Sequence, residues 1–197
     1  MSKRIGIFSG TFDPIHVGHV EACLVALGAL ELDEVLVMIE KNPTRKTNVT
    51  SYDHRKKMVK IALQDFKHIS FFDHAKNSRS ENIKFENTLP QFRQQYPDAQ
   101  VCLIVGSDML DHLHKWPNAK DWLPQLELCV VLRNNSDKAK TQKLLEDISV
   151  KIAKILPAVW SPISSSTIKA ELVAKKHPDG LHLGVLEYIQ SNHLYQI

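Results

Sequence analysis

Short runs of apolar residues recur along the chain, separated by longer segments in which apolar residues return every three or four positions. The runs are too short for helices and rich in β-branched residues, so they predict buried strands. We expect these strands at residues 5–8, 34–39, 69–72, 101–105, 126–132 and 155–160. Runs that are apolar at every position are typical of a parallel sheet that is covered on both faces.

The intervening segments have the spacing of helices. In the first, the positions that share a face are Val17, Val20, Leu24 and Leu27. In residues 52–66 the inward positions are Met58, Ile61, Ala62 and Leu63, and the solvated outer face carries Arg55, Lys56, Lys57 and Lys60. Further helices are expected at 87–96, at 109–115, at 137–153 with Leu144, Leu145, Ile148 and Ile152 inward, and from the serine-rich segment to about 175.

Alternation of strands and helices predicts an α/β fold with right-handed crossovers. We expect a single doubly wound (Rossmann-like) domain over residues 1–197, with a mostly parallel sheet of five or six strands and the C-terminal helices from about 162 packed on it. Such folds bind ligands beyond the carboxyl ends of the strands, where the strand order reverses. The loops at 9–14 and 106–108 both leave carboxyl ends, so the first and fourth strands should be neighbours at that point.

The composition of the chain limits the kinds of partner that it is expected to bind. The chain is 43% hydrophobic and 24% charged, which is typical of an ordinary soluble globular protein. A net charge of +3 is too small to indicate nucleic acid but suits small anionic substrates. Cys23, Cys102 and Cys129 lie in apolar segments without metal-type spacing, which favours buried, reduced thiols in a cytoplasmic protein. The sequence shows no secretory signal and no apolar segment of membrane-spanning length, so we expect no membrane partner.

The first candidate site is the turn between the first strand and the first helix. Gly10 permits a backbone conformation that other residues resist, and Pro14 pushes Asp13 away from the helical region, so 9–14 should be a tight loop. His16 and His19 follow, three residues apart on one side of the first helical turn, where free amide groups attract phosphate. The alternative is an ordinary turn followed by two surface histidines.

Two more segments could meet a ligand. Residues 161–169 place a cluster of hydroxyl side chains before an apolar-periodic helix, which by itself indicates an N-cap, although the same groups and Lys169 could hold a triphosphate. Gly106-Ser107-Asp108 follows the clearest strand of the chain, and Asp108 could equally cap the next helix.

The pattern Gly-Thr-Phe-Asp-Pro-x-His-x-Gly-His at 10–19 resembles the first signature of the nucleotidylyltransferase superfamily, and Ile-Ser-Ser-Ser-Thr-Ile-Lys at 163–169 resembles the second. Other pieces resemble the nicotinate-mononucleotide adenylyltransferase family, which makes deamido-NAD from ATP. These pieces are Asn87-Thr88-Leu89, Val105-Gly106-Ser107-Asp108, Leu113-His114-Lys115-Trp116 and Val185-Leu186-Glu187-Tyr188-Ile189.

The resemblance implies roles for individual residues. The catalytic residues would be His16, His19 and Lys169, and the ATP-binding residues would be Gly10, Thr11, Phe12, Gly106, Asp108, Ile163, Ser165 and Ser166. Thr88 would help to bind a pyridine mononucleotide and Trp116 would stack on its ring; without the family, Trp116 reads as a core residue at a helix end. Mg²⁺ would accompany ATP, with no metal ligand from the protein and no nucleic-acid partner.

The sequence departs from the family pattern in three places, and these differences leave the identity of the acceptor substrate open. Many family members have a Pro-Pro-His-Lys-like stretch where this chain has residues 41–46, and often Tyr-Thr where it has Lys84-Phe85. Lys169 replaces the usual arginine, as in phosphopantetheine adenylyltransferase, and loses the bidentate fork. The alternatives are therefore an adenylyltransferase for nicotinamide mononucleotide or phosphopantetheine, or a nucleotide-binding regulator without turnover. The sequence does not indicate an oligomeric state.

Overall fold

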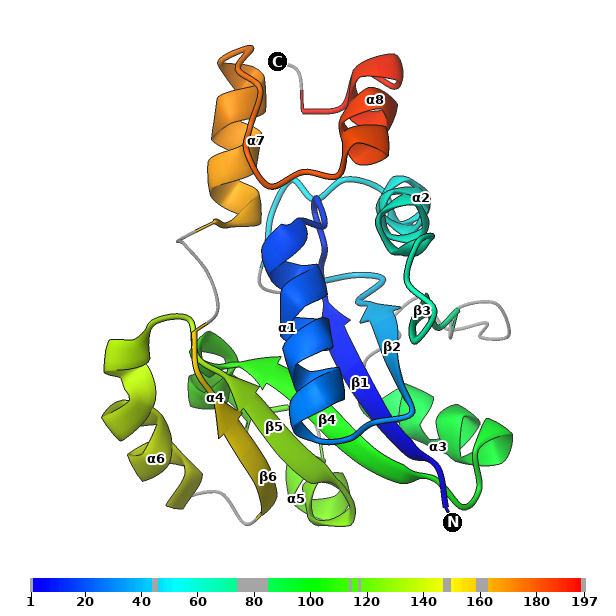
Figure 1. Cartoon of the computed structure of the whole chain (residues 1–197), viewed down its shortest axis with the longest axis vertical. Helices are drawn as coiled ribbons and strands as arrows, with labels where there is room; N and C mark the ends of the chain where they lie inside the picture. The colour runs from blue at the N-terminus through cyan, green and yellow to red at the C-terminus, as the bar shows by residue number, and fades with distance from the viewer. Residues whose placement is uncertain are drawn as a thin grey trace.

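The computed structural model describes residues 2–43, 46–73, 85–113, 115–116, 118–146, 150–158 and 163–195, with backbone alone for 85–87, 111 and 151–153. These residues form a six-stranded sheet in which every pair of neighbouring strands is parallel (Figure 1). The strands are β1 (Arg4–Gly10), β2 (Glu34–Ile39), β3 (Ile69–Phe71), β4 (Gln100–Gly106), β5 (Glu127–Val131) and β6 (Lys151–Leu156). The expected α/β class and strand number are therefore confirmed, and the sheet is wholly parallel.

Helices and short 3₁₀ turns connect the strands. They are α1 (Val17–Ala29), α2 (Tyr52–Leu63), α3 (Phe85–Gln95), α4 (Ser107–Leu113), α5 (Ala119–Trp122), η1 (Leu123–Gln125), η2 (Asn135–Asp137), α6 (Lys138–Glu146), α7 (Ser165–Val173) and α8 (Leu183–Ser191). Helices α1, α2 and α8 supply one buried apolar cluster, and α3 to α6 supply the other. The sheet thus lies between two apolar layers, as in doubly wound folds.

The strand order is β3-β2-β1-β4-β5-β6, so the chain first builds outward from β1 and then returns to start again at β4. Ile5 pairs with Val101 and Phe8 with Ile104, which confirms that the first and fourth strands are neighbours. The order reverses between these two strands. Their carboxyl ends therefore form the edge at which a ligand is expected.

Strand β1 shows why the strands are apolar throughout. Successive side chains of a strand point to opposite faces. Ile5 and Ile7 join the cluster on the α3 to α6 face, and Phe8 joins the cluster under α1 and α2. Both faces exclude water, so no polar position is left in the middle of the strand.

Helix α1 packs differently from the expectation. Its buried residues are Val20, Ala22, Cys23 and Ala26, whereas Leu24 is 40% exposed. The face toward the sheet is therefore built from small side chains, which let the helix axis approach the strands closely. The predicted face was wrong at Leu24 because spacing alone does not say which of two apolar stripes is covered.

The last strand begins earlier than its sequence indicated. We expected a helix over 137–153 and a strand over 155–160, but α6 ends at Glu146 and β6 covers Lys151–Leu156. Ile152, expected on a helix face, pairs with Leu128 of β5. A free edge of β5 offers hydrogen bonds that a longer α6 would leave unmade, and this tertiary pairing overrides the helical spacing. Ile148 and residues 159–160 lie outside the described residues.

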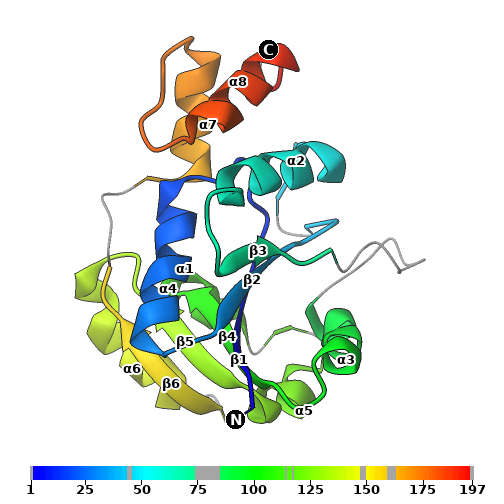
Figure 2. The same ribbon diagram turned by 45° about the vertical axis from the view of Figure 1, so that its right-hand side comes forward.

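Helices α7 and α8 lie beyond the end of the sheet toward which β1 and β2 point, in both views of the molecule (Figures 1 and 2). The amide of Val17 donates to the carbonyl of Gly180 at 2.8 Å, and α8 packs on α2. The expected serine-rich helix thus stands at the carboxyl edge of the sheet, close to the start of α1. No helix among the described residues is long and apolar enough to cross a membrane. All three cysteines are buried and free, as expected.

Candidate active site

The two histidines begin α1. His16 is the N-cap residue and His19 is the third residue of the helix, as the spacing predicted. Their ring centroids lie 3.7 Å apart with an interplanar angle of 32°, and the backbone N–H of His16 donates to Nδ1 of His19 at 3.2 Å. Because Nδ1 accepts this hydrogen bond, a neutral His19 carries its proton on Nε2. His19 therefore offers a fixed N–H donor.

Both imidazoles are kept uncharged. Burial, together with the positive charges of Arg133 and Lys46, lowers the pKa of His16 to about 4. Burial and the neighbouring His16 lower the pKa of His19 well below its usual value. At neutral pH the pair is thus a set of neutral donors, and an anion bound beside it would raise both pKa values.

The unusual backbone conformation that was expected at Gly10 is found at Phe12 instead. Gly10 ends β1, and a Cβ atom there would lie 2.9 Å from the Phe12 ring, so glycine makes room for that ring. The left-handed conformation belongs to Phe12, with a φ of 49°. Phe12 is 2% exposed, and its ring centroid lies 5.0 Å from that of His19. The Phe12 ring therefore packs against the His19 ring in an edge-to-face arrangement.

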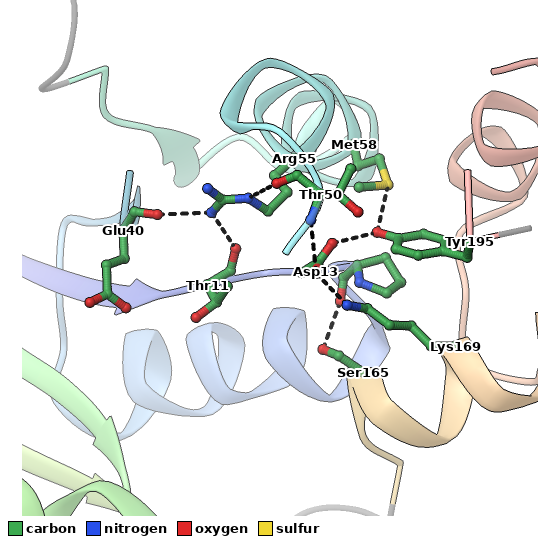
Figure 3. Close-up of polar contacts among 10 residues, drawn as sticks. Thr11, Asp13, Glu40, Thr50, Arg55, Met58, Ser165, Lys169 and Tyr195 are labelled. Carbon is green, nitrogen blue, oxygen red and sulfur yellow. Dashed lines mark hydrogen bonds and ion pairs between the residues drawn. The ribbon is translucent and has the colours of Figure 1, made fainter. Parts of the chain in front are cut away.

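Asp13 is a junction between distant parts of the chain (Figure 3). Its carboxylate is 2% exposed and forms an ion pair with Lys169 of α7. The hydroxyl of Tyr195 donates to Oδ1 at 2.7 Å, and the backbone N–H of Thr50 donates to Oδ2 at 3.3 Å. Burial raises the pKa of Asp13, but these hydrogen bonds outweigh it and hold the pKa below its usual value. From the sequence, Asp13 was expected only as part of the tight turn.

Arg55 is the largest correction to the sequence-based picture. It was expected on a solvated face of α2, yet it is 1% exposed. Its guanidinium donates to the carbonyl oxygens of Thr11, Glu40 and Thr50 at 2.8–2.9 Å (Figure 3). It also donates to the carbonyl oxygen of Lys41 at 2.8 Å. Burial lowers its pKa, while the Asp13 and Glu40 carboxylates oppose this effect. Arg55 thus ties the ends of β1 and β2 to α2. Its position in the first turn of a helix that follows a polar loop was the available signal.

The serine-rich segment adjoins the histidine loop. Ser164 is the N-cap of α7 and accepts from the amide of Thr167 at 3.1 Å, which confirms the expected cap. Ser165 donates to the carbonyl oxygen of Pro14 at 2.9 Å, and Ser166 is exposed. Ile163 lies against Gly180, where a Cβ atom would be 2.8 Å from its Cδ1 atom. Two segments about 150 residues apart are therefore in direct contact.

The third loop starts α4 at the carboxyl end of β4. A Cβ atom on Gly106 would collide with Oδ1 of Asp108, so the carboxylate of Asp108 folds back over the glycine. Asp108 pairs with Nε of Arg133 at 3.2 Å, and both side chains are about half exposed (53% and 50%). The hydroxyl of Ser107 accepts from the amide of Arg133 at 3.0 Å. Arg133 was missed from the sequence, where no motif marks it.

Positive charges gather at this edge. Arg133 and Lys46 act on both histidines, and Lys46 is in turn affected by Lys169. Partial desolvation and the Lys169 ammonium both lower the pKa of Lys46. Mutual repulsion of this kind is relieved when a polyanion binds. The edge is therefore electrostatically suited to phosphate groups.

The two residues expected to bind the acceptor belong to the other apolar layer. Thr88 is 1% exposed in α3, and Trp116 is partly exposed after α4, with its ring centroid 6.0 Å from that of buried Trp122. Trp116 packs against the cluster of α3 to α6, so part of its ring serves the core and part faces outward. His114, Thr44, Arg45 and Lys84, which belong to the compared segments, lie outside the described residues.

Within the part of the chain that the structure describes, no group of three or more His, Cys, Asp or Glu side chains could hold a metal ion. Asp13 is occupied by Lys169, Tyr195 and Thr50. The described residues therefore do not fit a metal centre held by the protein. A magnesium ion at this edge would depend on phosphate oxygens and water, which are ligands that it prefers.

Comparison with known proteins adds family membership. A family model described as cytidylyltransferase-like matches residues 7–171. A probable nicotinate-nucleotide adenylyltransferase of Clostridium botulinum is 33% identical over 201 residues, covering 98% of each chain. One of Neisseria meningitidis is 30% identical over 203 residues, covering 98% of this chain and 99% of the relative.

Solved structures share the fold. A nicotinic acid mononucleotide adenylyltransferase of Plasmodium falciparum, complexed with NaAD, superposes with a TM-score of 0.81 at 21% identity, covering 98% of this chain and 97% of that one. A putative nicotinate-nucleotide adenylyltransferase of Vibrio parahaemolyticus gives a TM-score of 0.67 at 18% identity, covering 98% and 95%. The likeness extends over the whole sheet and the helices around it.

Proposed function

This chain belongs to the nicotinate-nucleotide adenylyltransferases of the cytidylyltransferase-like family, and we propose that it transfers the adenylyl group of ATP to nicotinate mononucleotide, which gives deamido-NAD and pyrophosphate. The observation that carries the proposal is the contact between the histidine loop and the serine-rich helix, made by Ser165 on Pro14. Both family signatures meet there at the reversal of strand order.

The reaction needs little covalent help from the protein. The phosphate of the mononucleotide attacks the α-phosphorus of ATP in line, the bond from that phosphorus to the bridging oxygen breaks, and pyrophosphate leaves with the bond electrons. The acceptor is already a competent nucleophile, so catalysis depends on positioning and on stabilising the charge that develops. No enzyme-bound intermediate is required.

His16 and His19 supply neutral donors to the phosphate oxygens. A neutral imidazole can donate a hydrogen bond through its one N–H group without first gaining a proton, and the amides of the first turn of α1 add their own donors. As negative charge builds up on the transferring group, it also favours protonation of the pair. Neither histidine has to act as an obligatory base.

The remaining roles follow the two other loops. Gly10, Thr11 and Phe12 shape the phosphate loop, Gly106 and Asp108 would meet ATP near its ribose, and Ile163, Ser165, Ser166 and Lys169 would complete the triphosphate site. Lys169 would supply a point charge in place of the two-pronged contact of an arginine. Mg²⁺ bound to the triphosphate would neutralise the leaving pyrophosphate.

The acceptor would lie toward α3 and α4. The partly exposed ring of Trp116 offers a flat apolar surface for an electron-poor pyridine ring. Thr88, which is buried in α3, would help to bind the mononucleotide. The preference for the nicotinate form would follow if this region offers donors to its carboxylate.

A single assay tests the reaction and the acceptor together. Purified protein is mixed with ATP, Mg²⁺ and one of three acceptors, namely nicotinate mononucleotide, nicotinamide mononucleotide or phosphopantetheine, and pyrophosphate release is followed while the nucleotide product is identified by chromatography. We expect release with nicotinate mononucleotide and formation of deamido-NAD. If pyrophosphate is released with one of the other acceptors but not with nicotinate mononucleotide, the assigned substrate is wrong. If the protein binds ATP but releases no pyrophosphate with any of the three acceptors, it is a regulator instead.

A further inference from the structure

Two donors from different elements share the Asp13 carboxylate. Lys169 binds Oδ2, and the hydroxyl of Tyr195 donates to Oδ1 at 2.7 Å. The Lys169 ammonium also lies 5.2 Å from the centroid of the Tyr195 ring. Tyr195 therefore contacts both members of the ion pair, one through its hydroxyl and the other through the face of its ring (Figure 3).

We propose that Tyr195 is a positioning residue for adenylyl transfer, which holds the Lys169 ammonium where the triphosphate of ATP binds. The proposal rests on the proposed function, in which Lys169 meets that triphosphate. It adds a residue from the segment after α8, a part of the chain that neither phosphate signature includes.

Lysine needs such support more than arginine would. A lysine side chain ends in a point charge on four methylene groups, and holding it in one place costs much of its rotamer freedom. The Asp13 carboxylate and the face of the Tyr195 ring both contact the Lys169 ammonium, and these contacts limit that freedom before ATP binds. The Lys169 side chain is 29% exposed, whereas that of Asp13 is 2% exposed, so of the two partners the lysine is the one that solvent and an incoming anion can reach.

The phenol hydroxyl also limits how strongly Asp13 retains the lysine. By donating to Oδ1, it takes up part of the carboxylate charge that would otherwise draw Lys169 inward. Burial and the Asp13 carboxylate raise the pKa of Tyr195, so the hydroxyl stays protonated and remains a donor. A hydrogen bond with Thr50 opposes this rise in the pKa, and a further contact of the hydroxyl, with Sδ of Met58 at 3.9 Å, is weak.

Tyr188 provides a matched control. It lies in α8, seven residues before Tyr195, and its hydroxyl is 2.9 Å from Nδ1 of His54 on α2. Each tyrosine thus ties the same part of the chain to the body of the protein through one hydroxyl. Of these two tyrosines, Tyr195 contacts the Asp13–Lys169 pair, whereas the hydroxyl contact of Tyr188 is with His54.

The experiment is a double-mutant cycle. Tyr195→Phe, Lys169→Met, the double variant and Tyr188→Phe are compared with the starting protein. For each, the Kd of ATP is measured by calorimetry, the KM values of ATP and of nicotinate mononucleotide are measured in the coupled assay, and thermal unfolding reports stability. Loss of one hydrogen bond should weaken ATP binding about threefold to tenfold in Tyr195→Phe, with the KM of the mononucleotide unchanged.

The cycle separates positioning from mere support. We expect Tyr195→Phe to have no further effect on ATP binding once Lys169 is methionine, and Tyr188→Phe to lower thermal stability without changing ATP binding. An unchanged Kd in Tyr195→Phe would overturn the proposal, and so would an equal loss in the Lys169→Met background. If the starting protein shows no turnover with nicotinate mononucleotide, the proposed function fails, but the four Kd values of the cycle, compared with that of Tyr188→Phe, still decide whether Tyr195 supports ATP binding through Lys169.

Discussion

Asp13 and His16 are three residues apart in one loop and almost equally buried, at 2% and 3% exposed, yet one side chain is charged and the other is neutral. Donors from Lys169, Tyr195 and Thr50 hold the pKa of Asp13 below its usual value, so the carboxylate is ionised. Burial and nearby positive charges lower the pKa of His16 to about 4, so the imidazole is neutral.

The difference separates an anchor from a binding surface. The Asp13 half of the loop, together with Arg55, has its charge matched by donors and acceptors of the protein itself. The histidine half faces positive charge from Arg133 and Lys46, which the exposed Asp108 carboxylate balances only in part and which an added anion would balance further. We infer that the first half holds the loop in place while the second half binds phosphate.

Removing the anchor should have the largest effect. Arg55→Met should lower the free energy of unfolding by about 3–4 kcal/mol, because several carbonyl oxygens lose a charged donor at once. Urea unfolding measures this, with Lys57→Met as the control, since Lys57 is exposed on the same helix. A loss no greater than that of the control would contradict the role of Arg55 as an anchor.

Changing the binding half should affect turnover instead. His19→Ala should reduce kcat about 100-fold or more, the scale of one lost donor to the transition state. Steady-state kinetics with ATP and nicotinate mononucleotide tests this, alongside thermal unfolding to show that the variant is folded. Exposed His177→Ala is the control and should keep full activity. Normal turnover in His19→Ala would remove the histidine pair from the mechanism.

Acid should reveal the neutral histidine. Below pH 6.5 an unfolded histidine takes up a proton that His16 resists until about pH 4, so stability should fall as pH falls through this window. The loss due to His16 should reach about 2 kcal/mol at pH 5. Urea unfolding in buffers without phosphate measures it, and His16→Gln should flatten the curve by that amount. If stability falls with pH in the same way in His16→Gln and in the starting protein, His16 is not held neutral.

The exposed pair should matter least for stability. Arg133→Ala breaks the contact with Asp108, but both side chains are about half exposed, so the free energy of unfolding should change by no more than about 1 kcal/mol. Urea unfolding at low and high salt checks this, because any contribution should shrink as salt screens the pair. A loss comparable to that of Arg55→Met would erase the distinction between the two regions.

Much of the fold was predictable because each buried strand is a short apolar run. The neighbours β1 and β4 followed from two loops at carboxyl ends, and the pairing of Ile5 with Val101 bears this out. The prediction was wrong at β6, where Ile152 pairs with Leu128 although its spacing is helical. A local pattern could not show that the edge of β5 was free.

The site residues also divide into those whose positions the local sequence predicted and those whose positions it did not. The positions of His16 and His19 at the start of α1 and the cap formed by Ser164 were readable, because strand-turn-helix and N-cap patterns are local. The roles in binding and catalysis of all the site residues stay predictions. The burial of Arg55 was not predicted, since a basic residue among lysines on a helix is usually solvated.

The sequence by itself determined the parallel sheet, the turn that carries the histidines and the cap of the serine-rich helix, because hydrophobic period and turn chemistry act within a few residues. Only the tertiary structure decided that Asp13, Lys169 and Tyr195 share one carboxylate, and that His16 is neutral beside it. Charge state and ion pairing depend on burial and on partners from distant segments. Those are set only when the chain has folded.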